Sequence, residues 1–512
     1  MKRRTFLAGG AVAGAAAAIV RPSAPWAADQ RLAPDDIETA VARLRAQYLQ
    51  FDPAYVENVI VPHFLVSIYK GERMFLPMVD LQFTKENAIP RDLWGLLSES
   101  WKIAPEDGVT VFLQGLENRG PENMRKRIYM SALTPDLYQP MYSGKVVRFF
   151  DKLLDGRNAN RPLMRPYLES YFDLYWDLHL GVKGEMIPAR VLQIGESFNT
   201  VLAHRDPTQE IVYVHYMMVR EHLAFLKEWI DEKIDDLKTG ITPDPEKTFV
   251  HYWIKNGGEG ENFAHKDVVF EVFHNFVALS QWGNTIYNIM LKLASDTGDA
   301  DARAWFRKTM EGDFDKADGS AFTPLERFVM ELFRTISPNG GTISAMAEGR
   351  EPPFPRHGYV VTPHAESSFA PMHWSDPDSF NPDRYKAAPT SHDIDEARCR
   401  QVGFTACPFE RTAFEVKDGR RASIRNSAFG TVYGVVDEKP LPVCDSAGFA
   451  PFGFGYRRCP GEQLTIQVFE DFLKKVWASK IEFQKLDIAD AEQLPIGPST
   501  VIADDVGFTR FA

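Results

Sequence analysis

A single cysteine lies in a glycine-rich loop near the end of the chain, directly before an apolar run (464–477) that is typical of a helix. Glycine lets the backbone turn tightly against a flat group, and the unpaired N–H groups that begin the helix favour a thiolate. A thiolate with a cation beside it is what an oxygen-activating haem iron requires as its axial ligand. The alternative is a structural cysteine before an amphipathic helix. Five constrained positions coincide here and favour the haem interpretation: Phe452, Gly455, Arg457, Cys459 and Gly461.

The pattern F-x-x-G-x-R-x-C-x-G resembles the haem-binding loop of the cytochrome P450 superfamily. The resemblance implies haem b with Cys459 as the iron ligand, Arg457 paired with a haem propionate, and Phe452 packed near the thiolate. It also implies a mainly α fold with small β-sheets, in which a triangular prism of helices surrounds one haem.

Two further motifs stand upstream of the loop in the order that the resemblance implies. Glu331 and Arg334 form E-x-x-R within the predicted helix 324–334, and one helical turn places both on one face. Arg384 belongs to an F-x-P-x-R-[FY] element that begins at Phe380. Alone, such a pair is usually a solvated salt bridge. The resemblance implies instead that Glu331, Arg334 and Arg384 form a buried structural triad.

The apolar run 267–293 predicts a long helix, which resembles the helix that crosses the distal face of the haem in this superfamily. Oxygen-activating members carry an acid followed by threonine there, and the pair delivers protons. This run has no acidic residue from 272 to 295. In the best ungapped placement Asn284 stands at the threonine position, and a one-residue slip returns Thr285 to it without restoring the acid. The amides of Gln281 and Asn284 resemble branches that rearrange fatty-acid hydroperoxides; the alternative is that they satisfy one another inside a buried helix.

A basic segment, 120–127, resembles the helix whose arginine meets a haem propionate. Arg127 is the candidate, with Arg125 as the alternate. Asn123 stands where an aromatic residue or histidine is common. The alternative is a solvated basic helix end.

Other segments predict the remaining secondary structure. Apolar spacing and turn residues predict helices at 34–50, 90–101, 167–180 and 213–237, and a hairpin at 64–79. The resemblance to the cytochrome P450 superfamily implies a further hairpin within 487–511, which would reach into the substrate pocket.

The first residues resemble a twin-arginine export signal. Arg3 and Arg4 precede an uncharged run, 5–20, that is short for a membrane span of roughly 20 residues. We expect a signal peptide over 1–28 and a single haem domain over 29–512. The twin-arginine translocon would carry the folded protein to the periplasm or beyond; the alternative is a disordered or membrane-anchoring N-terminus.

The segment 386–449 is longer than the resemblance implies, and we interpret it as an insertion. It holds Cys399, Cys407 and Cys444, and stretches that predict small strands. Two of these cysteines could form a disulfide in an oxidising compartment, or all three could remain thiols.

Composition limits the function classes. The chain has 512 residues, 44% of them hydrophobic, which is ample for a large core. A net charge of −12 argues against nucleic acid as a partner.

The reaction has three candidate forms, all on a small apolar substrate of fatty-acid-like kind. These are a monooxygenase fed by a periplasmic electron donor, a peroxygenase that uses peroxide, and a hydroperoxide isomerase or lyase. Export removes the enzyme from cytoplasmic NAD(P)H, and the acid is missing, so we favour peroxide chemistry. A haem-binding sensor without turnover is the alternative from another class.

Overall fold

The computed structural model describes part of the chain. The predicted elements between 34 and 101, the signal peptide, Arg125 and Arg127 lie outside the described residues. The structure describes residues 128–203, 210–257, 265–316, 318–320, 322–336, 342–345, 359–362, 368–369, 376–386, 414–415, 421–422, 433–436, 439–442, 451–452, 459, 461–497 and 500–511.

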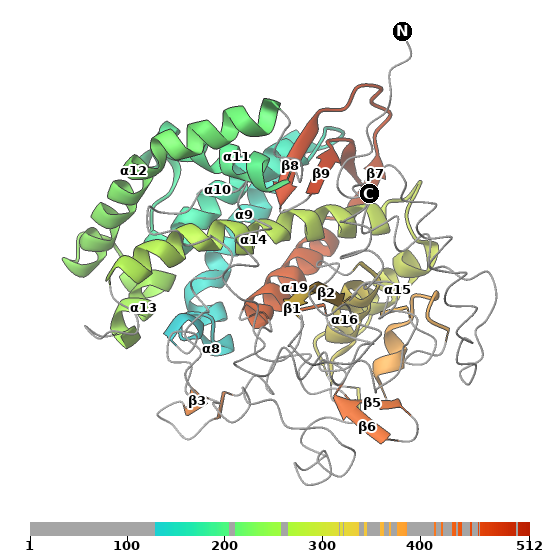
Figure 1. The fold of residues 1–512 in the computed structure, drawn as a ribbon. Coiled ribbons are helices and arrows are strands. Elements are labelled where there is room, and N and C mark those ends of the chain that lie inside the picture. The colour runs from blue at the N-terminus through green and yellow to red at the C-terminus, as the bar shows by residue number, and fades with distance from the viewer. Residues whose placement is uncertain are drawn as a thin grey trace. The chain divides into compact units, whose positions relative to one another are not determined.

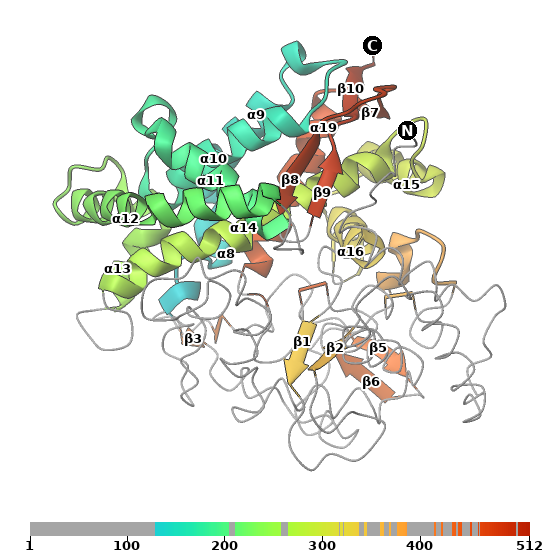
Figure 2. The same cartoon turned by 45° about the horizontal axis from the view of Figure 1, so that its top comes forward.

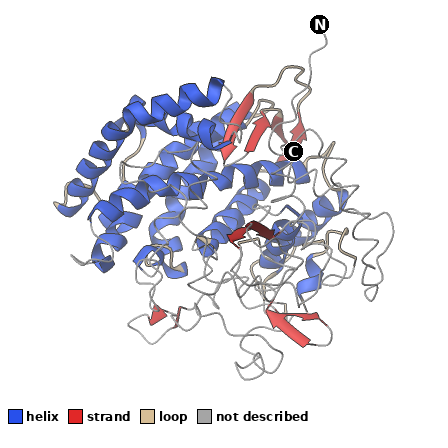
Figure 3. Ribbon diagram, in the orientation of Figure 1, coloured by secondary structure: helices blue, strands red, loops and turns tan. Residues whose placement is uncertain are grey.

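The chain divides into two compact units. The first combines residues 1–11, 94–312 and 460–512, and the second combines residues 12–93 and 313–459. Helices dominate the described residues and all sheets are small, as Figure 3 shows, so the predicted mainly α class is confirmed. The single domain predicted over 29–512 stays a prediction.

The first unit is built from helices that pack around α14. Figures 1 and 2 show α12 alongside α14, with α10, α11 and α13 close by. The long helices predicted at 167–180, 213–237, 267–293 and 464–477 are confirmed as α10, α12, α14 and α19. The helices are α8 (Pro135–Leu137), α9 (Ser143–Leu153), α10 (Met164–Leu180), α11 (Ala189–Ala203), α12 (Glu210–Lys238), α13 (Phe249–Gly257), α14 (His265–Leu293), α15 (Ala300–Glu311) and α19 (Glu462–Ala478), with short helices at Tyr138–Tyr142, Gly156–Asn158, Gly184–Met186 and Pro245–Lys247.

The end of α10 shows how local sequence sets a boundary. Gly181 follows the helix with φ +72, a left-handed conformation that favours glycine. A Cβ there would also come within 2.8 Å of Thr242 Cγ2. The helix therefore stops at Leu180, and its aromatic residues are buried in the core.

The C-terminal strands form two antiparallel pairs. β7 (Ile481–Lys485) pairs with β10 (Val506–Arg510), and β8 (Gln493–Gly497) pairs with β9 (Thr500–Ala503). The hairpin predicted within 487–511 is thus present as β8–β9. The last strand, β10, pairs with β7 and not with β9. Asp504, between β9 and β10, accepts hydrogen bonds from the N–H groups of Met164 and Arg165, which begin α10.

The second unit centres on α16 (Pro324–Ile336), as the E-x-x-R segment predicted. A capping box begins it: Glu326 Oε2 accepts from Thr323 N at 2.7 Å, and Glu326 N donates to Thr323 Oγ1 at 3.2 Å. The small strands predicted in the insertion are confirmed. The further elements are β1 (Thr342–Ala345) with β2 (Tyr359–Thr362), a 3-10 helix (Pro382–Tyr385), β3 (Phe414–Glu415) with β4 (Arg421–Ala422), and β5 (Tyr433–Val436) with β6 (Lys439–Pro442).

Among the described residues, no helix combines the length and the apolarity that a membrane span requires.

A buried hydrogen-bond chain ties α10 to α14 in the first unit. His179 Nδ1 lies 2.8 Å from Tyr175 O, which can only accept, so this nitrogen carries the hydrogen. His179 Nε2 then accepts from Asn275 Nδ2 at 2.9 Å, and Asn275 Oδ1 accepts from the Tyr129 hydroxyl. His179 is fully buried, and burial lowers its pKa to about 3.

Because of this low pKa, the free energy of unfolding depends on pH. Above the ordinary histidine pKa of 6.5, His179 is neutral in both states. As the pH falls from 6.5 towards 3, only the unfolded chain takes up the proton, so stability falls by about 1.4 kcal/mol per pH unit. Glutamine at 179 can still donate and accept hydrogen bonds but does not take up a proton. Between pH 6.5 and 5 we expect the free energy of unfolding of His179→Gln to fall by about 2 kcal/mol less than that of the native chain. Urea unfolding at both pH values measures this.

His222→Gln is the matched control, because that imidazole on α12 is only half-buried. Its unfolding curves should follow those of the native chain. Identical pH dependence in His179→Gln and the native chain would show that the buried imidazole does not set the acid response.

Candidate functional site

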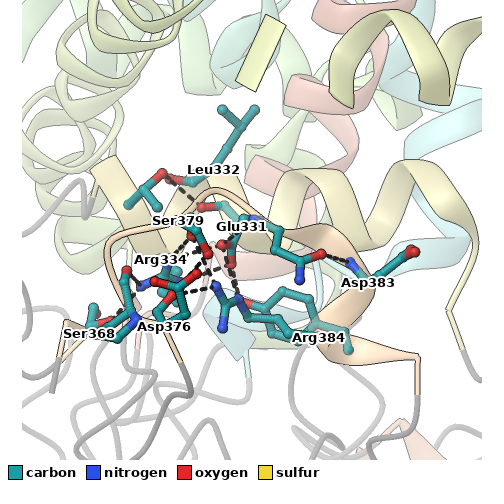
Figure 4. A network of polar contacts seen from close by, with 12 residues as sticks. Glu331, Leu332, Arg334, Ser368, Asp376, Ser379, Asp383 and Arg384 are labelled. Atoms are coloured by element: carbon teal, nitrogen blue, oxygen red, sulfur yellow. Dashed lines mark hydrogen bonds and ion pairs between the residues drawn. The ribbon is translucent and has the colours of Figure 1, made fainter. Parts of the chain in front are cut away.

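A buried carboxylate organises the polar network of the second unit. Glu331 in α16 accepts from Arg334 Nε and Nη2, both at 2.8 Å, and from Arg384 Nε at 3.1 Å. It also accepts from Asn381 N at 2.9 Å and from the Tyr385 hydroxyl at 3.1 Å. The side chains of Glu331 and Arg334 are 0% exposed. In the predicted triad both arginines pair with Glu331, as Figure 4 shows.

Arg334 uses every N–H of its guanidinium. Besides the two bonds to Glu331, it donates to the carbonyl oxygens of Ser368 (2.8 Å), Pro377 (2.9 Å) and Ser379 (3.1 Å). Burial opposes the charged form, but the hydrogen bond and charge of Glu331 outweigh it and raise the pKa of Arg334 above its ordinary value. Arg334 therefore joins α16 to two loop segments, 368–369 and 376–381, as a permanent cation.

The cysteine loop packs on the same helix. The ring of Phe452 lies 5.0 Å from that of Phe333, which stands between Glu331 and Arg334 on α16. The Cys459 N–H donates to Phe452 O at 2.8 Å, which closes the loop onto itself. Cys459 is exposed and forms no disulfide among the described residues. The second unit thus presents an exposed thiol from a loop anchored beside a rigid buried network.

Of the three other predicted residues of the loop region, the structure describes one. Gly455 and Arg457 lie outside the described residues. Gly461 belongs to the first unit, where it is the N-cap of α19 and its carbonyl accepts from Thr465 N at 2.9 Å.

The packing of α14 identifies its two sides. Trp282 Nε1 donates to Thr465 Oγ1 of α19 at 3.1 Å. A Cβ on Gly283 would lie 2.5 Å from Ile496 Cγ1 and 2.7 Å from Tyr167 Cε1, so this side is closed by β8 and α10. Residues of an α-helix follow one another at about 100°. Positions 281, 285 and 288 therefore lie on the side opposite Gly283, and position 284 lies about 100° from Gly283.

The packing at Gly283 limits what one placement of the distal motif could hold. The ungapped placement puts Gly283 at the position of the acid, where no side chain fits. The placement shifted by one residue puts Asn284 at the acid position and Thr285 at the hydroxyl position, about 100° and 200° around the helix from Gly283. Both placements stay predictions, and in the shifted one an amide stands where the acid is expected.

Replacing Gly283 tests this packing directly. We expect Gly283→Ala to lower the free energy of unfolding by about 1–3 kcal/mol, because the methyl group would overlap Ile496 and Tyr167. Gly144→Ala in α9 is the matched control: its nearest neighbour lies at 4.0 Å, so helix propensity should stabilise it slightly. Equal urea midpoints for the two variants would show that α14 has room at 283.

The distal candidates differ in how their polar atoms are used. Thr285 is buried, and its hydroxyl donates to Gln281 O at 3.0 Å within the helix. Asn284 is half-buried, and its Oδ1 accepts from Asn288 Nδ2 at 2.8 Å. The half-buried Gln281 side chain has no hydrogen-bond partner among the described residues. The α14 surface therefore carries amides and no ionisable group at these positions.

No family model matches the sequence, and no curated protein matches it. Solved structures do match. A mutant of cytochrome P450SP alpha (CYP152B1) aligns with a TM-score of 0.52 and 14% identity over 85% of this chain and 89% of its own. The retinoic-acid-bound cyanobacterial CYP120A1 aligns with a TM-score of 0.51 and 15% identity over 77% and 80%. The cytochrome P450DA heme domain aligns with a TM-score of 0.50 and 11% identity over 85% and 86%.

This chain has the cytochrome P450 fold. At these identities the likeness establishes the fold, and the chemistry must be argued from the residues. The donor set fits a haem: one exposed thiol, in a loop closed by its own backbone and backed by Phe452, can approach a flat group as an axial ligand.

Sequence reasoning did not foresee the hydrogen bonds of two residues in this cytochrome P450 fold. Tyr385 follows Arg384 directly and adds its hydroxyl to Glu331, although a tyrosine in such an element is easily interpreted as core. Asn288 lies one turn beyond Asn284, and its spacing on the same helical side was a usable signal.

Proposed function

We propose that this protein is a haem-thiolate oxidoreductase that oxidises an apolar organic substrate, with peroxide as the preferred oxidant. The observation that carries the proposal is Cys459, an exposed thiol in a self-closed loop packed on α16, within a cytochrome P450 fold. Haem b is the proposed cofactor, and one neighbour of the same fold is itself described as a heme domain.

Each part of the chain has a defined role in this proposal. When bound, a thiolate-ligated haem would favour cleavage of the O–O bond. Cys459 would hold the iron, and Phe452 would shield the sulfur from water. Arg457 and Arg127 (with Arg125 as its alternate) would hold the propionates. The Glu331–Arg334–Arg384 network would keep α16 and the loop in place without taking part in the reaction.

The residues on α14 support peroxide chemistry over dioxygen activation. Dioxygen activation needs protons delivered at the distal side, and peroxide already carries both its protons and its electrons. At the acid position stands Asn284, an amide that cannot release a proton at neutral pH, and the Thr285 hydroxyl is engaged with Gln281 O. These positions can orient an oxygen ligand without protonating it.

An apolar substrate of fatty-acid-like kind fits the same proposal. One neighbour of the same fold is a complex with retinoic acid, an apolar chain with a carboxylate at its end. We extend this class of ligand to the present chain as part of the proposal.

Two alternative reactions remain in the proposal. Isomerisation or lysis of a fatty-acid hydroperoxide uses the same amides and is the second candidate. A monooxygenase fed by a periplasmic electron donor is the third. A haem-binding sensor is the alternative without turnover.

We also propose export by the twin-arginine translocon, followed by action in the periplasm or outside the cell. Arg3 and Arg4 before the uncharged run 5–20 support this. Replacing both with lysine should retain the protein in the cytoplasm, as cell fractionation would show; unchanged export would contradict it.

Haem-loaded protein tests the proposed function. We expect the dithionite-reduced CO complex to show the red-shifted Soret band of a thiolate haem. Hydrogen peroxide should then drive oxidation of a long-chain fatty acid without an electron donor. Hydroperoxide consumption that yields only rearranged products would favour the isomerase or lyase. Turnover only with supplied electrons would contradict peroxide chemistry, and no turnover under any condition would favour the sensor.

A further inference from the structure

Two buried tyrosines on α10 carry hydroxyl groups without a protein partner. Tyr167 and Tyr171 are each 1% exposed, and neither hydroxyl meets a hydrogen-bond partner within the described part of the chain. Tyr175, the next tyrosine along the helix, differs because its hydroxyl donates to Val272 O of α14. Buried hydroxyls are normally paired, since leaving one unpaired costs free energy. Phenylalanine would fill the same space at 167 and 171 without that cost, so core packing alone does not account for the pair.

The spacing of the two rings sets the distance between their hydroxyls. The ring centroids of Tyr167 and Tyr171 lie 5.5 Å apart, and the ring planes differ by 15°. Residues four apart on a helix have Cβ atoms about 5–6 Å apart. The separation is thus similar at the base and at the centre of the rings, so the hydroxyl oxygens also lie about 5.5 Å apart. An O–H···O hydrogen bond spans about 2.7–2.8 Å, so one oxygen atom between the two hydroxyls can bond to both.

The surroundings of the pair limit what can bind there. Phe149 stands edge-on to Tyr167 at 5.7 Å, and Phe172 contacts Tyr171 at 5.5 Å. Burial raises the pKa of both hydroxyls well above its ordinary value, and the charge of Tyr171 would raise the pKa of Tyr167 further, so both stay protonated. An ion would lose its hydration here without a counter-charge. A neutral molecule with one oxygen needs only two to four polar partners.

We propose that one water molecule is bound between the hydroxyls of Tyr167 and Tyr171 in the first unit. The water would accept a hydrogen bond from one hydroxyl and donate one to the other. It would complete the polar contacts of α10 at two positions that the rest of the described chain leaves unpaired. This binding site goes beyond the proposed function and is independent of it, because both tyrosines belong to one helix.

Removing the hydroxyls singly and together tests the shared water. Tyr167→Phe and Tyr171→Phe each keep the ring and remove one polar partner. We expect each variant of the full, haem-loaded chain to have a lower urea midpoint, because the remaining hydroxyl and the water lose a partner. The double variant should lose less than the two single losses together, since the first substitution already breaks the bridge.

Tyr175→Phe is the matched control on the same helix. Its hydroxyl has a partner of its own in Val272 O, so its removal should lower the urea midpoint as well. In a variant that combines it with Tyr167→Phe, the two losses should add, because these hydroxyls share no partner.

Infrared difference spectra between ordinary water and water labelled with heavy oxygen detect the bridging molecule itself. A buried water gives a sharp O–H stretching band outside the broad absorption of the liquid, and heavy oxygen shifts that band. We expect one such band of the native protein to disappear in Tyr167→Phe and in Tyr171→Phe. The same band should remain in Tyr175→Phe.

The outcomes decide the proposal without reference to the haem. A higher or unchanged urea midpoint in either single variant would show an unpaired hydroxyl and overturn the shared water. Single losses that add fully in the double variant would show a separate partner for each hydroxyl. A native set of infrared bands in both single variants would also contradict the bridge. None of these results affects the thiolate assignment, which the reduced-CO band tests separately.

Discussion

Replacing Cys459 by serine is expected to abolish the thiolate Soret band of the reduced CO complex. Serine has nearly the same size, but its hydroxyl does not ionise at neutral pH and is a poor ligand for haem iron. Peroxide-driven oxidation should fall to the level of free haem, because thiolate donation favours O–O cleavage. The loop itself should persist, since its closing bond runs from the backbone N–H of residue 459 to Phe452 O. Absorption spectra and circular dichroism of the same samples measure both effects.

The chain provides a matched control of identical chemistry. Cys444→Ser makes the same substitution in the segment 386–449, outside the pattern 452–461 in the sequence. We expect it to keep the native band. A native band in Cys459→Ser, or its loss in Cys444→Ser, would move the iron ligand to another residue and remove the basis of the proposed function.

Local spacing predicted part of the site well. Glu331 and Arg334 are three residues apart, so one helical turn was enough to place them together. The prediction could not show that Glu331 accepts five hydrogen bonds, because those donors come from segments up to 54 residues along the chain. Burial of the pair depends on such long-range packing, which no spacing rule contains.

The long helix α14 shows where sequence reasoning stops. Its apolar content predicted the helix, and its missing acid was visible directly. The side on which each residue lies was not, because Gly283 is closed by Tyr167 and Ile496, which are distant in sequence. The two placements of the distal motif differ by one residue, which is about 100° around the helix. Spacing alone does not distinguish them.

The largest expected effect on stability comes from Glu331→Gln. The carboxylate neutralises Arg334, which is fully buried, and accepts bonds from four residues. Glutamine removes the charge and directs an N–H₂ group at existing donors. Breaking one partner of a buried ion pair costs about 3–5 kcal/mol, because the other charge is left uncompensated. We expect a loss of this size in the free energy of unfolding, measured by urea denaturation, and loss of bound haem in the same range of urea.

Asp383→Asn separates this effect from a general response to losing an acid. It makes the same change from carboxylate to amide in the neighbouring 3-10 helix, where Asp383 forms a half-exposed pair with Lys386 at 3.0 Å. Solvent screens that pair, so its loss should cost less than about 1 kcal/mol. If both variants lost the same stability, the buried network around Glu331 would not be what holds α16 and its loops together. If only Glu331→Gln lost stability and haem together, the network would be the support of the cysteine loop, because Phe333 and Phe452 join the two directly.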